Sequence, residues 1–293
     1  MKKRRFGYLF GALFVFCLLL FAAPRRAEAA SYTIRYNDDG TATLKYASSG
    51  AVAAQLSVKG ERVAQGVVAT STNVFYLTYA VGQSNNVYSI IQQNLSTGAK
   101  KRLARLGTTF STYHLRAIYD GSLYLEGTIP GGQGSACRFT VKTRKFEAIA
   151  KGRWAYGYKK RFVIGGGNSG MPSASTCYIY NTKSRKLTVA ATYVLGTGYS
   201  GQYAYFASLK SPTDTFTYYH TSYYKLIRYD LAAAKRKTLV SSFKAFQVEK
   251  ITPQYVYHTG YSSSAGKTVY YRYNIAQKKN VQISEATYNK SVE

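Results

Sequence analysis

A repeat of about 45 residues runs through most of this chain and limits what it can fold into. In each copy a short strand ends in Asn, Thr or Asp, a polar turn with Lys or Arg follows, and a second strand begins. The end residues are Asn94, Thr140, Asn181, Asp230 and Asn274, at intervals of 46, 41, 49 and 44 residues. Such a regular period indicates one supersecondary unit that is stacked several times.

A second pattern recurs out of phase with the first. It is a turn followed by a strand rich in aromatic and aliphatic residues, and these strands are 75–77, 123–125, 162–164, 203–205 and 255–257. Each repeat therefore contains two hairpins. Four short strands in about 45 residues are typical of one blade of a β-propeller. A β-solenoid is the alternative, but its units are shorter and rarely supply two hairpins each.

The first part of the mature chain repeats less regularly. We expect strands near Tyr32–Tyr36, Thr41–Tyr46, Val52–Val58 and Arg62–Gln65, and Asp39-Gly40 is a hairpin signal. This ragged unit and the five clear repeats make six. We therefore expect an all-β chain in which residues 30–293 form one six-bladed β-propeller of four-stranded antiparallel blades.

Residues 1–29 have the three parts of a secretory signal peptide. Lys2–Arg5 are basic, Phe6–Ala23 are apolar, and Ala27-Glu28-Ala29 is a small-x-small cleavage site. The alternative is an uncleaved anchor, because an 18-residue apolar run can just cross a bilayer. The cleavage site favours a mature chain that is secreted, associated with the cell wall, and in contact with a membrane only peripherally.

Two of the repeats carry a resemblance to a known group of proteins. Residues 87–103 and 268–274, the latter ending Tyr-Arg-Tyr-Asn before a Lys-rich turn, resemble repeats of secreted bacterial six-bladed propellers of the TolB-like and DUF5050-like kind. The resemblance covers about residues 66–284. It implies a propeller that binds a partner rather than one with a set reaction.

The turn between the third and fourth strands of each clear repeat is basic. Residues 1–29 hold six of the 40 Lys and Arg and one of the 12 Asp and Glu, so the mature net charge is +23. Fourteen of the remaining 34 cations lie in or beside these turns, and we call them the basic crown: Lys100, Lys101, Arg102, Lys142, Arg144, Lys145, Lys183, Arg185, Lys186, Lys235, Arg236, Lys237, Lys278 and Lys279.

The basic crown predicts an anionic partner. Because neighbouring strands of a blade are antiparallel, these turns share one face of the propeller, and such an array attracts a polyanion through many salt-sensitive contacts. Outside the cell we expect an anionic cell-wall polymer such as teichoic acid, or anionic lipid headgroups, and not nucleic acid. The alternative is that the lysines only keep hairpins soluble and edge strands unpaired.

The opposite face is expected to carry longer loops, rich in Gly, Ser and Tyr. These are residues 82–86, 129–136, 165–175, 209–222 and 259–267. Tyr and Trp rings suit a glycan or a peptide of an envelope protein. The candidates in or near the loops are Trp154, Tyr199, Tyr218, Tyr219, Tyr223, Tyr224 and Tyr261. The alternative for each is a strand residue packed between blades.

The sequence offers little support for catalysis or for a cofactor. His114, His220 and His258 are interpreted as ordinary histidines at loop edges, and no Gly-x-Ser-x-Gly elbow occurs. Asp38-Asp39 fit a turn better than a calcium loop, since the closing Glu is missing. We expect no catalytic residue, no metal site and no cofactor. A propeller glycosidase or lyase with carboxylates at the channel remains the alternative function, and a protein-assembly platform is a third.

Two further motifs are interpreted as structural. Residues 165–170 match Gly-x-Gly-x-x-Gly, but a strand and not a helix is expected next, so they predict a loop and not a dinucleotide site. Cys137 and Cys177 occupy equivalent positions in consecutive repeats, too far apart for the expected disulfide geometry. We therefore expect no disulfide between them. We also expect the protein to be a monomer.

Overall fold

The computed structural model describes residues 31–80, 87–129, 134–165, 175–210, 222–262 and 264–293. Within these ranges the chain forms strands β1 to β22 and one short helix, α2. The predicted signal segment lies outside the described residues. In the part that is described, no helix has the length and apolarity needed to span a bilayer.

The strands assemble into successive antiparallel sheets. The first sheet has three strands: β1 (Tyr32–Tyr36), β2 (Ala42–Tyr46) and β3 (Val52–Leu56). The second contains β4 (Glu61–Ala69), β5 (Asn73–Ala80), β6 (Tyr88–Asn94) and β7 (Lys100–Arg105). The third contains β8 (Thr112–Tyr119), β9 (Ser122–Thr128), β10 (Gly134–Thr140) and β11 (Lys145–Lys151).

The middle of the chain forms one seven-stranded sheet, and the last strands form a four-stranded one. The seven strands are β12 (Arg153–Tyr158), β13 (Arg161–Gly165), β14 (Ser175–Asn181), β15 (Lys186–Ser200), β16 (Tyr203–Leu209), β17 (Ser222–Asp230) and β18 (Lys235–Ala245). The last sheet contains β19 (Gln247–Ile251), β20 (Tyr255–Ser262), β21 (Lys267–Asn274) and β22 (Lys279–Ile283).

Strand β15 serves two units at once. Its residues 186–191 pair with β14, and its residues 196–200 pair with β16. The register shifts between these halves, and Tyr193 adopts a φ of +53° there. Divided at this point, the seven-stranded sheet gives two four-stranded units. The described chain then has six successive units, which is compatible with the expected six blades.

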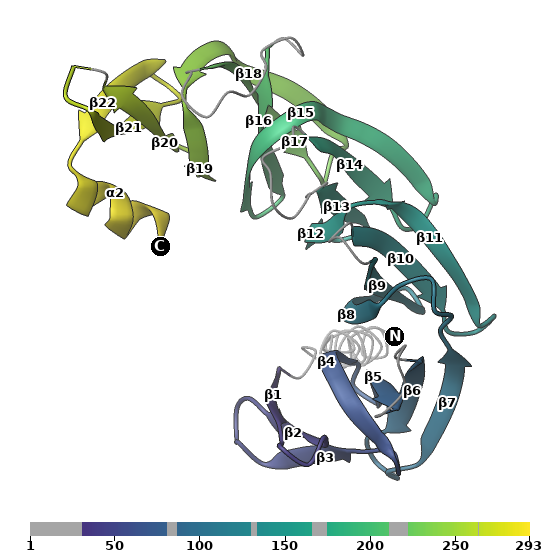
Figure 1. The fold of residues 1–293 in the computed structure, drawn as a ribbon. Coiled ribbons are helices and arrows are strands. Elements are labelled where there is room, and N and C mark those ends of the chain that lie inside the picture. The colour runs from purple at the N-terminus through teal and green to yellow at the C-terminus, as the bar shows by residue number, and fades with distance from the viewer. Residues whose placement is uncertain (1–30, 81–86, 130–133, 166–174, 211–221, 263) are drawn as a thin grey trace, which may run out of the picture.

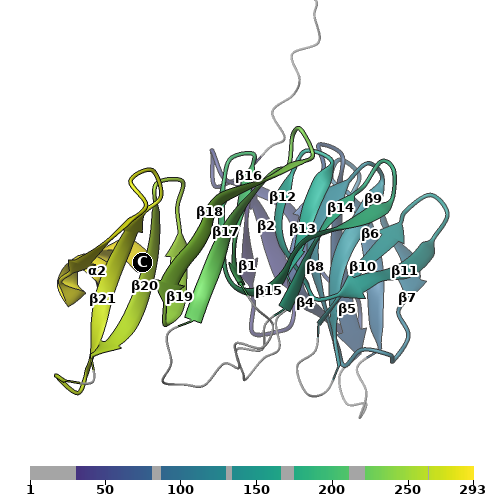
Figure 2. The ribbon, with the colours of Figure 1, turned by 90° about the horizontal axis from the view of Figure 1, so that it is seen from above.

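The sheets follow one another around an open arc (Figure 1). The sheet of β1–β3 lies at one end of the arc, and the sheet of β19–β22 lies at the other. Strands β4, β8 and β12 face the inside of the arc, whereas β7 and β11 lie on its outside. Seen from above, the strands run side by side and their turns gather on two opposite faces (Figure 2).

The core consists of apolar layers between neighbouring sheets. Alternation along each strand sends every second side chain toward the next sheet. Between the first and second sheets, for example, Leu44 and Leu56 pack with Tyr76 and Ile91, and each of these four is at most 2% exposed. One buried polar pair crosses such a layer: Arg138, 3% exposed, donates to Tyr180 Oη at 3.0 Å, and it also contacts the Glu147 carboxylate.

Helix α2 (Glu285–Val292) follows the last strand and was not anticipated from the sequence. The Ser284 hydroxyl caps it by accepting from Thr287 N at 3.2 Å. Its one buried residue, Tyr288, packs edge-on against Tyr257 and lies 4.9 Å from the Tyr270 ring centroid. The helix therefore covers part of the last sheet on the side that faces away from the fifth unit.

The structure corrects two expectations. Residues 62–65 belong to β4, which pairs with β5 across the Thr70–Asn73 turn, so within the described residues the first unit has three strands and not four. His258 lies inside β20 and not at a loop edge: it is 2% exposed, and its ring nitrogens contact Asn280 Oδ1 and Thr259 O. His114 likewise lies within β8, and His220 is outside the described residues.

Cys137 and Cys177 are both buried. Burial raises the pKa of Cys137 to about 12, so its thiol stays protonated at neutral pH. The Gly-rich stretch at residues 165–170 lies between β13 and β14, and all of it beyond Gly165 is outside the described residues.

Candidate anion-binding face and pocket

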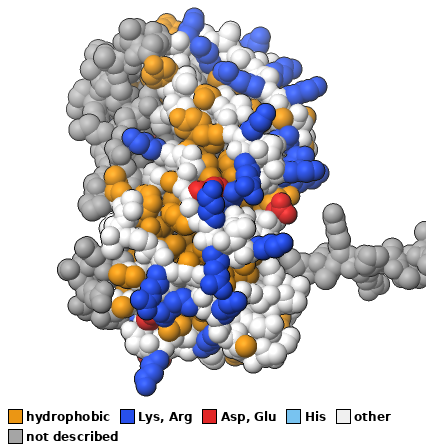
Figure 3. All heavy atoms as spheres, turned by 90° about the vertical axis from the view of Figure 1, so that its right-hand side faces the viewer, with side chains coloured by type: hydrophobic (Ala, Val, Ile, Leu, Met, Phe, Trp, Pro, Cys, Tyr) orange, Lys and Arg blue, Asp and Glu red, His pale blue; other side chains and the backbone are white. Residues whose placement is uncertain are grey.

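The basic crown lies on one face, at the hairpins that join the third and fourth strands of the units. Five of its members are in the turns themselves: Lys142, Arg144, Lys183, Arg185 and Lys278. The other nine are among the first residues of β7, β11, β15, β18 and β22. All fourteen are exposed except Arg102, which is half-buried. Figure 3 shows the outer side of the arc, where Lys and Arg side chains are numerous and acidic side chains are few.

In four of the five clear repeats the residue that ends the third strand organises the turn after it. Asn181 Oδ1 accepts from the backbone N–H groups of Lys183 and Ser184 at 3.1 and 3.2 Å, and Asp230 Oδ1 accepts from Ala232 and Ala233 at 2.9 Å. Asn94 and Asn274 act in the same way. These Asx turns explain why Asn or Asp recurs at this position. Hydrogen bonds from Ala233, Gln202 and Ala232 hold the pKa of Asp230 below its ordinary value.

A left-handed residue completes four of these turns. Arg144, Arg185, Ala234 and Lys278 have φ between +54° and +58°, immediately before the fourth strand begins. The repeated turn conformation fixes where each basic side chain leaves the backbone. The crown is therefore carried by rigid hairpins and not by long loops.

Few of the crown cations are neutralised within the protein. Three ion pairs join described residues: Arg102 with Glu61, Arg116 with Glu126, and Arg138 with Glu147. Only the first involves a crown residue. The other thirteen crown cations have no carboxylate within salt-bridge distance among the described residues, so their charge is directed to solvent.

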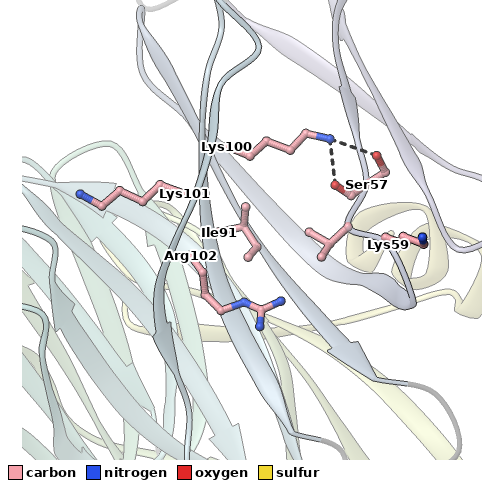
Figure 4. Close-up of a pocket in the computed structure, with 7 residues that line it drawn as sticks. Ser57, Lys59, Ile91, Lys100, Lys101 and Arg102 are labelled. Atoms are coloured by element: carbon pink, nitrogen blue, oxygen red, sulfur yellow. Dashed lines mark hydrogen bonds between the residues drawn. The ribbon is translucent and has the colours of Figure 1, made fainter.

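One end of the crown lines a pocket of about 410 Å³ between the first two sheets (Figure 4). Its lining residues are Ser57, Val58, Lys59, Ile91, Lys100, Lys101 and Arg102. Lys100 and Arg102 lie on the same face of β7, and their side chains point toward the first sheet. Because side chains alternate along a strand, the Lys101 side chain between them points to the other side. The half-buried Val58 supplies apolar surface between these charges, and the buried Ile91 lies beneath it.

Hydrogen bonds fix the walls of this pocket. Lys100 Nζ donates to Ser57 O at 2.9 Å and to Ser57 Oγ at 3.0 Å. Arg102 donates to Glu61 Oε1 at 2.5 Å, and the other oxygen of Glu61 accepts from the Thr78 hydroxyl. With Lys59, Lys100 and Arg102 opposed by Glu61 alone, the pocket has an excess of positive charge. It can accept an anion or a short acidic segment with an apolar side.

Sequence reasoning found Lys100, Lys101 and Arg102 but missed Ser57, Lys59 and Glu61 as their neighbours. Ser57 and Lys100 are 43 positions apart, and nothing in either segment shows that they meet. Local patterns could not have found the pocket, since it depends on how two sheets pack.

The aromatic candidates of the opposite face lie in different surroundings. Trp154 is in β12, surrounded by the rings of Tyr124, Phe162 and Tyr180, and its indole N–H donates to Leu125 O at 2.8 Å. Tyr199 stacks on Tyr156, and burial raises the pKa of Tyr199 to about 12.

The remaining aromatic candidates divide by exposure. Tyr224 is fully buried, whereas Tyr223 and Tyr261 are 50% and 48% exposed. Tyr218 and Tyr219 lie outside the described residues. Of the described candidates, Tyr223 and Tyr261 thus present the most ring surface to a partner.

Three of the described carboxylates each bind separate partners within the protein. Glu126, on β9, is almost fully buried and accepts from Arg116 Nε and Nη2 at 2.9 and 2.6 Å. Asp39 accepts from Thr41 N at 2.9 Å within the first hairpin, and Glu285 accepts from the Tyr270 hydroxyl at 3.0 Å. Among the described residues, no three His, Cys, Asp or Glu side chains gather as metal ligands do.

Comparisons with known proteins identify the fold. No family model matches the chain, and no curated protein matches it. A solved eukaryotic initiation factor matches with 13% identity and a TM-score of 0.50, over 89% of this chain and 66% of that one.

Two further solved structures match less closely. TolB from Acinetobacter baumannii matches with 14% identity and a TM-score of 0.39, over 92% and 67% of the two chains. An oligogalacturonate lyase in complex with manganese matches with 8% identity and a TM-score of 0.46, over 88% and 75%. At such identities a likeness shows the fold alone. The chain is a β-propeller of antiparallel, mostly four-stranded sheets.

Proposed function

We propose that this protein is a secreted, non-catalytic binding module of the bacterial cell envelope that holds an anionic polymer on its basic crown. One observation carries the proposal: thirteen exposed cations on rigid hairpins of one face have no carboxylate partner among the described residues. A long polyanion can contact several hairpins at once. The signal-like N-terminus supports a location where cell-wall polymers are present.

The affinity of such a surface comes from the number of its ion pairs and not from any single contact. One exposed ion pair contributes about 0–1 kcal/mol. Contacts on a continuous polymer add with a high effective concentration, so several weak pairs give useful affinity. Because each neutralised phosphate releases a counterion, binding should fall steeply with salt. A buried apolar site would show no such salt dependence.

The first experiment measures binding of the purified protein to isolated Gram-positive cell walls, with and without their teichoic acid, across a salt series. Binding that requires the polymer and weakens with salt is expected. Long-chain inorganic polyphosphate and polygalacturonate serve as defined probes for phosphate and carboxylate polymers. Binding that persists on stripped walls or ignores salt would contradict the proposal.

A matched pair of variants separates the crown from net charge. The crown variant carries Lys142→Gln, Lys183→Gln, Lys235→Gln and Lys278→Gln. The control variant carries Lys151→Gln, Lys210→Gln, Lys244→Gln and Lys267→Gln, all exposed residues at the opposite ends of the strands. Both lose four charges. The crown variant should bind polyphosphate much more weakly than the control variant, whereas equal losses would mean that only net charge attracts the polymer.

A further inference from the structure

Strand β3 differs from the other strands at the outer edges of the sheets. The outer-edge strands are β3, β7, β11, β18 and β22. Each of the last four begins with one to three Lys or Arg residues. Charged side chains, Lys above all, are a common protection of sheet edges against unwanted pairing. Strand β3 reads Val-Ala-Ala-Gln-Leu and carries no charge at all.

The free edge of β3 is also where the first sheet lacks a strand. Within the described residues β3 pairs with β2 alone, whereas the units that follow each have a fourth strand beyond the third. Alternate residues of β3 therefore direct backbone N–H and C=O groups away from β2. Val52, at the start of the strand, is 54% exposed.

The pocket described above lies next to this edge. Ser57, its first lining residue, follows directly on Leu56, the last residue of β3. In the second unit the fourth strand places Leu103, 5% exposed, in the apolar layer against the third sheet. The pocket thus adjoins one end of the edge along which a fourth strand of the first unit would pair.

We propose that β3 pairs with an extended acidic segment of another protein, which completes the first sheet as its fourth strand. Backbone hydrogen bonds to β3 would supply affinity, and the pocket would supply specificity. Apolar side chains that alternate along the segment would contact the half-buried Val58, and carboxylates would reach Lys59 and Lys100. The charge excess of the pocket selects an acidic segment and disfavours a basic one. This inference does not depend on a polymer binding to the crown.

The test uses short peptides as probes and the purified full-length protein. The first probe alternates Glu and Val over nine residues, and the second replaces every Glu with Lys. The Glu peptide should bind at least about tenfold more tightly than the Lys peptide. Its binding should slow amide hydrogen exchange at Val52–Leu56. The proposal is overturned if the Lys peptide binds equally well, or if no binding occurs at about 1 mM.

Two N-methylated versions of the Glu peptide distinguish strand pairing from charge attraction. In one the odd-numbered residues are methylated, and in the other the even-numbered ones. Only one set of N–H groups faces β3 in a paired strand, so one isomer should bind and the other should not. Equal binding of the two isomers would show that the peptide is held by charge alone and would overturn the proposal.

Protein variants place the probe at this edge. Lys59→Glu, at an exposed turn residue, should weaken the Glu peptide about 3–10-fold. The crown variant, whose four substitutions lie on other units, should leave it unchanged. A larger loss in the crown variant than in Lys59→Glu would place the peptide elsewhere. A concentration-dependent dimer that competes with the peptide would show that a second copy takes the edge, and would overturn an acidic partner.

Discussion

The outer edge of the first sheet and the outer edges of the later sheets have been built in opposite ways. Strands β7, β11, β18 and β22 begin with basic residues that follow a fixed turn, and together these residues form the crown. Strand β3 has no basic residue, and in the part of the chain that the structure describes no fourth strand lies beside it. The repeated hairpin that we propose presents charge to a polymer also places charged residues on its own edge, a common protection against unwanted pairing. Where that hairpin is missing, a strand edge and a pocket remain open.

The largest expected effect concerns the apolar packing that stabilises the first sheet and the later sheets. Leu56→Ala removes a fully buried side chain between the first two sheets, and Leu226→Ala does the same between the seven-stranded sheet and the last sheet. Each should lower the free energy of unfolding by about 2–5 kcal/mol. Chemical denaturation measures the loss.

The location of the loss should differ between these two variants. The first sheet contacts the second through one apolar layer and a few hydrogen bonds, such as Gly66 N to Tyr36 Oη at 2.9 Å. Leu56→Ala should therefore speed amide exchange mainly in β1–β3, whereas Leu226→Ala should speed it in the sheets on both sides. Uniform exchange in Leu56→Ala would contradict this separation.

A smaller effect is the pH dependence of stability, which should differ between the last sheet and the first. Burial lowers the pKa of His258 below its unfolded value, although Asn280 and Thr259 oppose this shift. The unfolded chain then binds more protons, so stability should fall as pH drops below about 6.5. Exchange in β20 and β21 should rise with acid while that in β1–β3 does not. His258→Gln should reduce this acid sensitivity; His114→Gln is the control, since His114 also has a lowered pKa but lies in another sheet.

A smaller effect again is expected at the pocket wall. Lys100→Met keeps the apolar part of the side chain but removes the two hydrogen bonds to Ser57. The contact is exposed, so the loss of stability should be below about 1 kcal/mol. Lys101→Met, whose side chain points away from the pocket, is the matched control. A loss of several kcal/mol in Lys100→Met would mean that this bond holds the first sheet in place.

The smallest effect should be that of the crown on stability. The four substitutions of the crown variant remove exposed charges without described ion pairs, so each should change the free energy of unfolding by less than about 0.5 kcal/mol. Thermal unfolding of the variant beside the wild type measures this. A large destabilisation would indicate a structural role, and loss of solubility without loss of polymer binding would favour edge protection alone.

Much of the fold could be predicted because its signals are local. The Asn or Asp at the end of each third strand accepts hydrogen bonds from the next few residues, so its period shows directly in the sequence. The shared face of the basic turns then follows from antiparallel pairing. Helix α2 also had a local signal that was passed over, namely Ser284 as a cap with Glu285 in the first turn.

The errors came from interactions between distant residues. Residues 62–65 alternate in the same way whether they pair with β3 or with β5, and only the tertiary structure decides. No sequence signal showed that His258 packs against Phe243 and Asn280. The same holds for Trp154, which packs against Tyr124 and Tyr180. The pocket could not be predicted because it depends on how the end of the first sheet packs against the second sheet.

The most direct test of the central claim is the salt dependence of polyphosphate binding for the wild type, the crown variant and the control variant. Each phosphate contact contributes about 0.7–0.9 to the slope of log affinity against log salt. The account predicts a slope that is shallower by about 3 in the crown variant and nearly unchanged in the control variant. Equal slopes in all three proteins would contradict it, and would leave the basic crown as protection for the edges of the sheets.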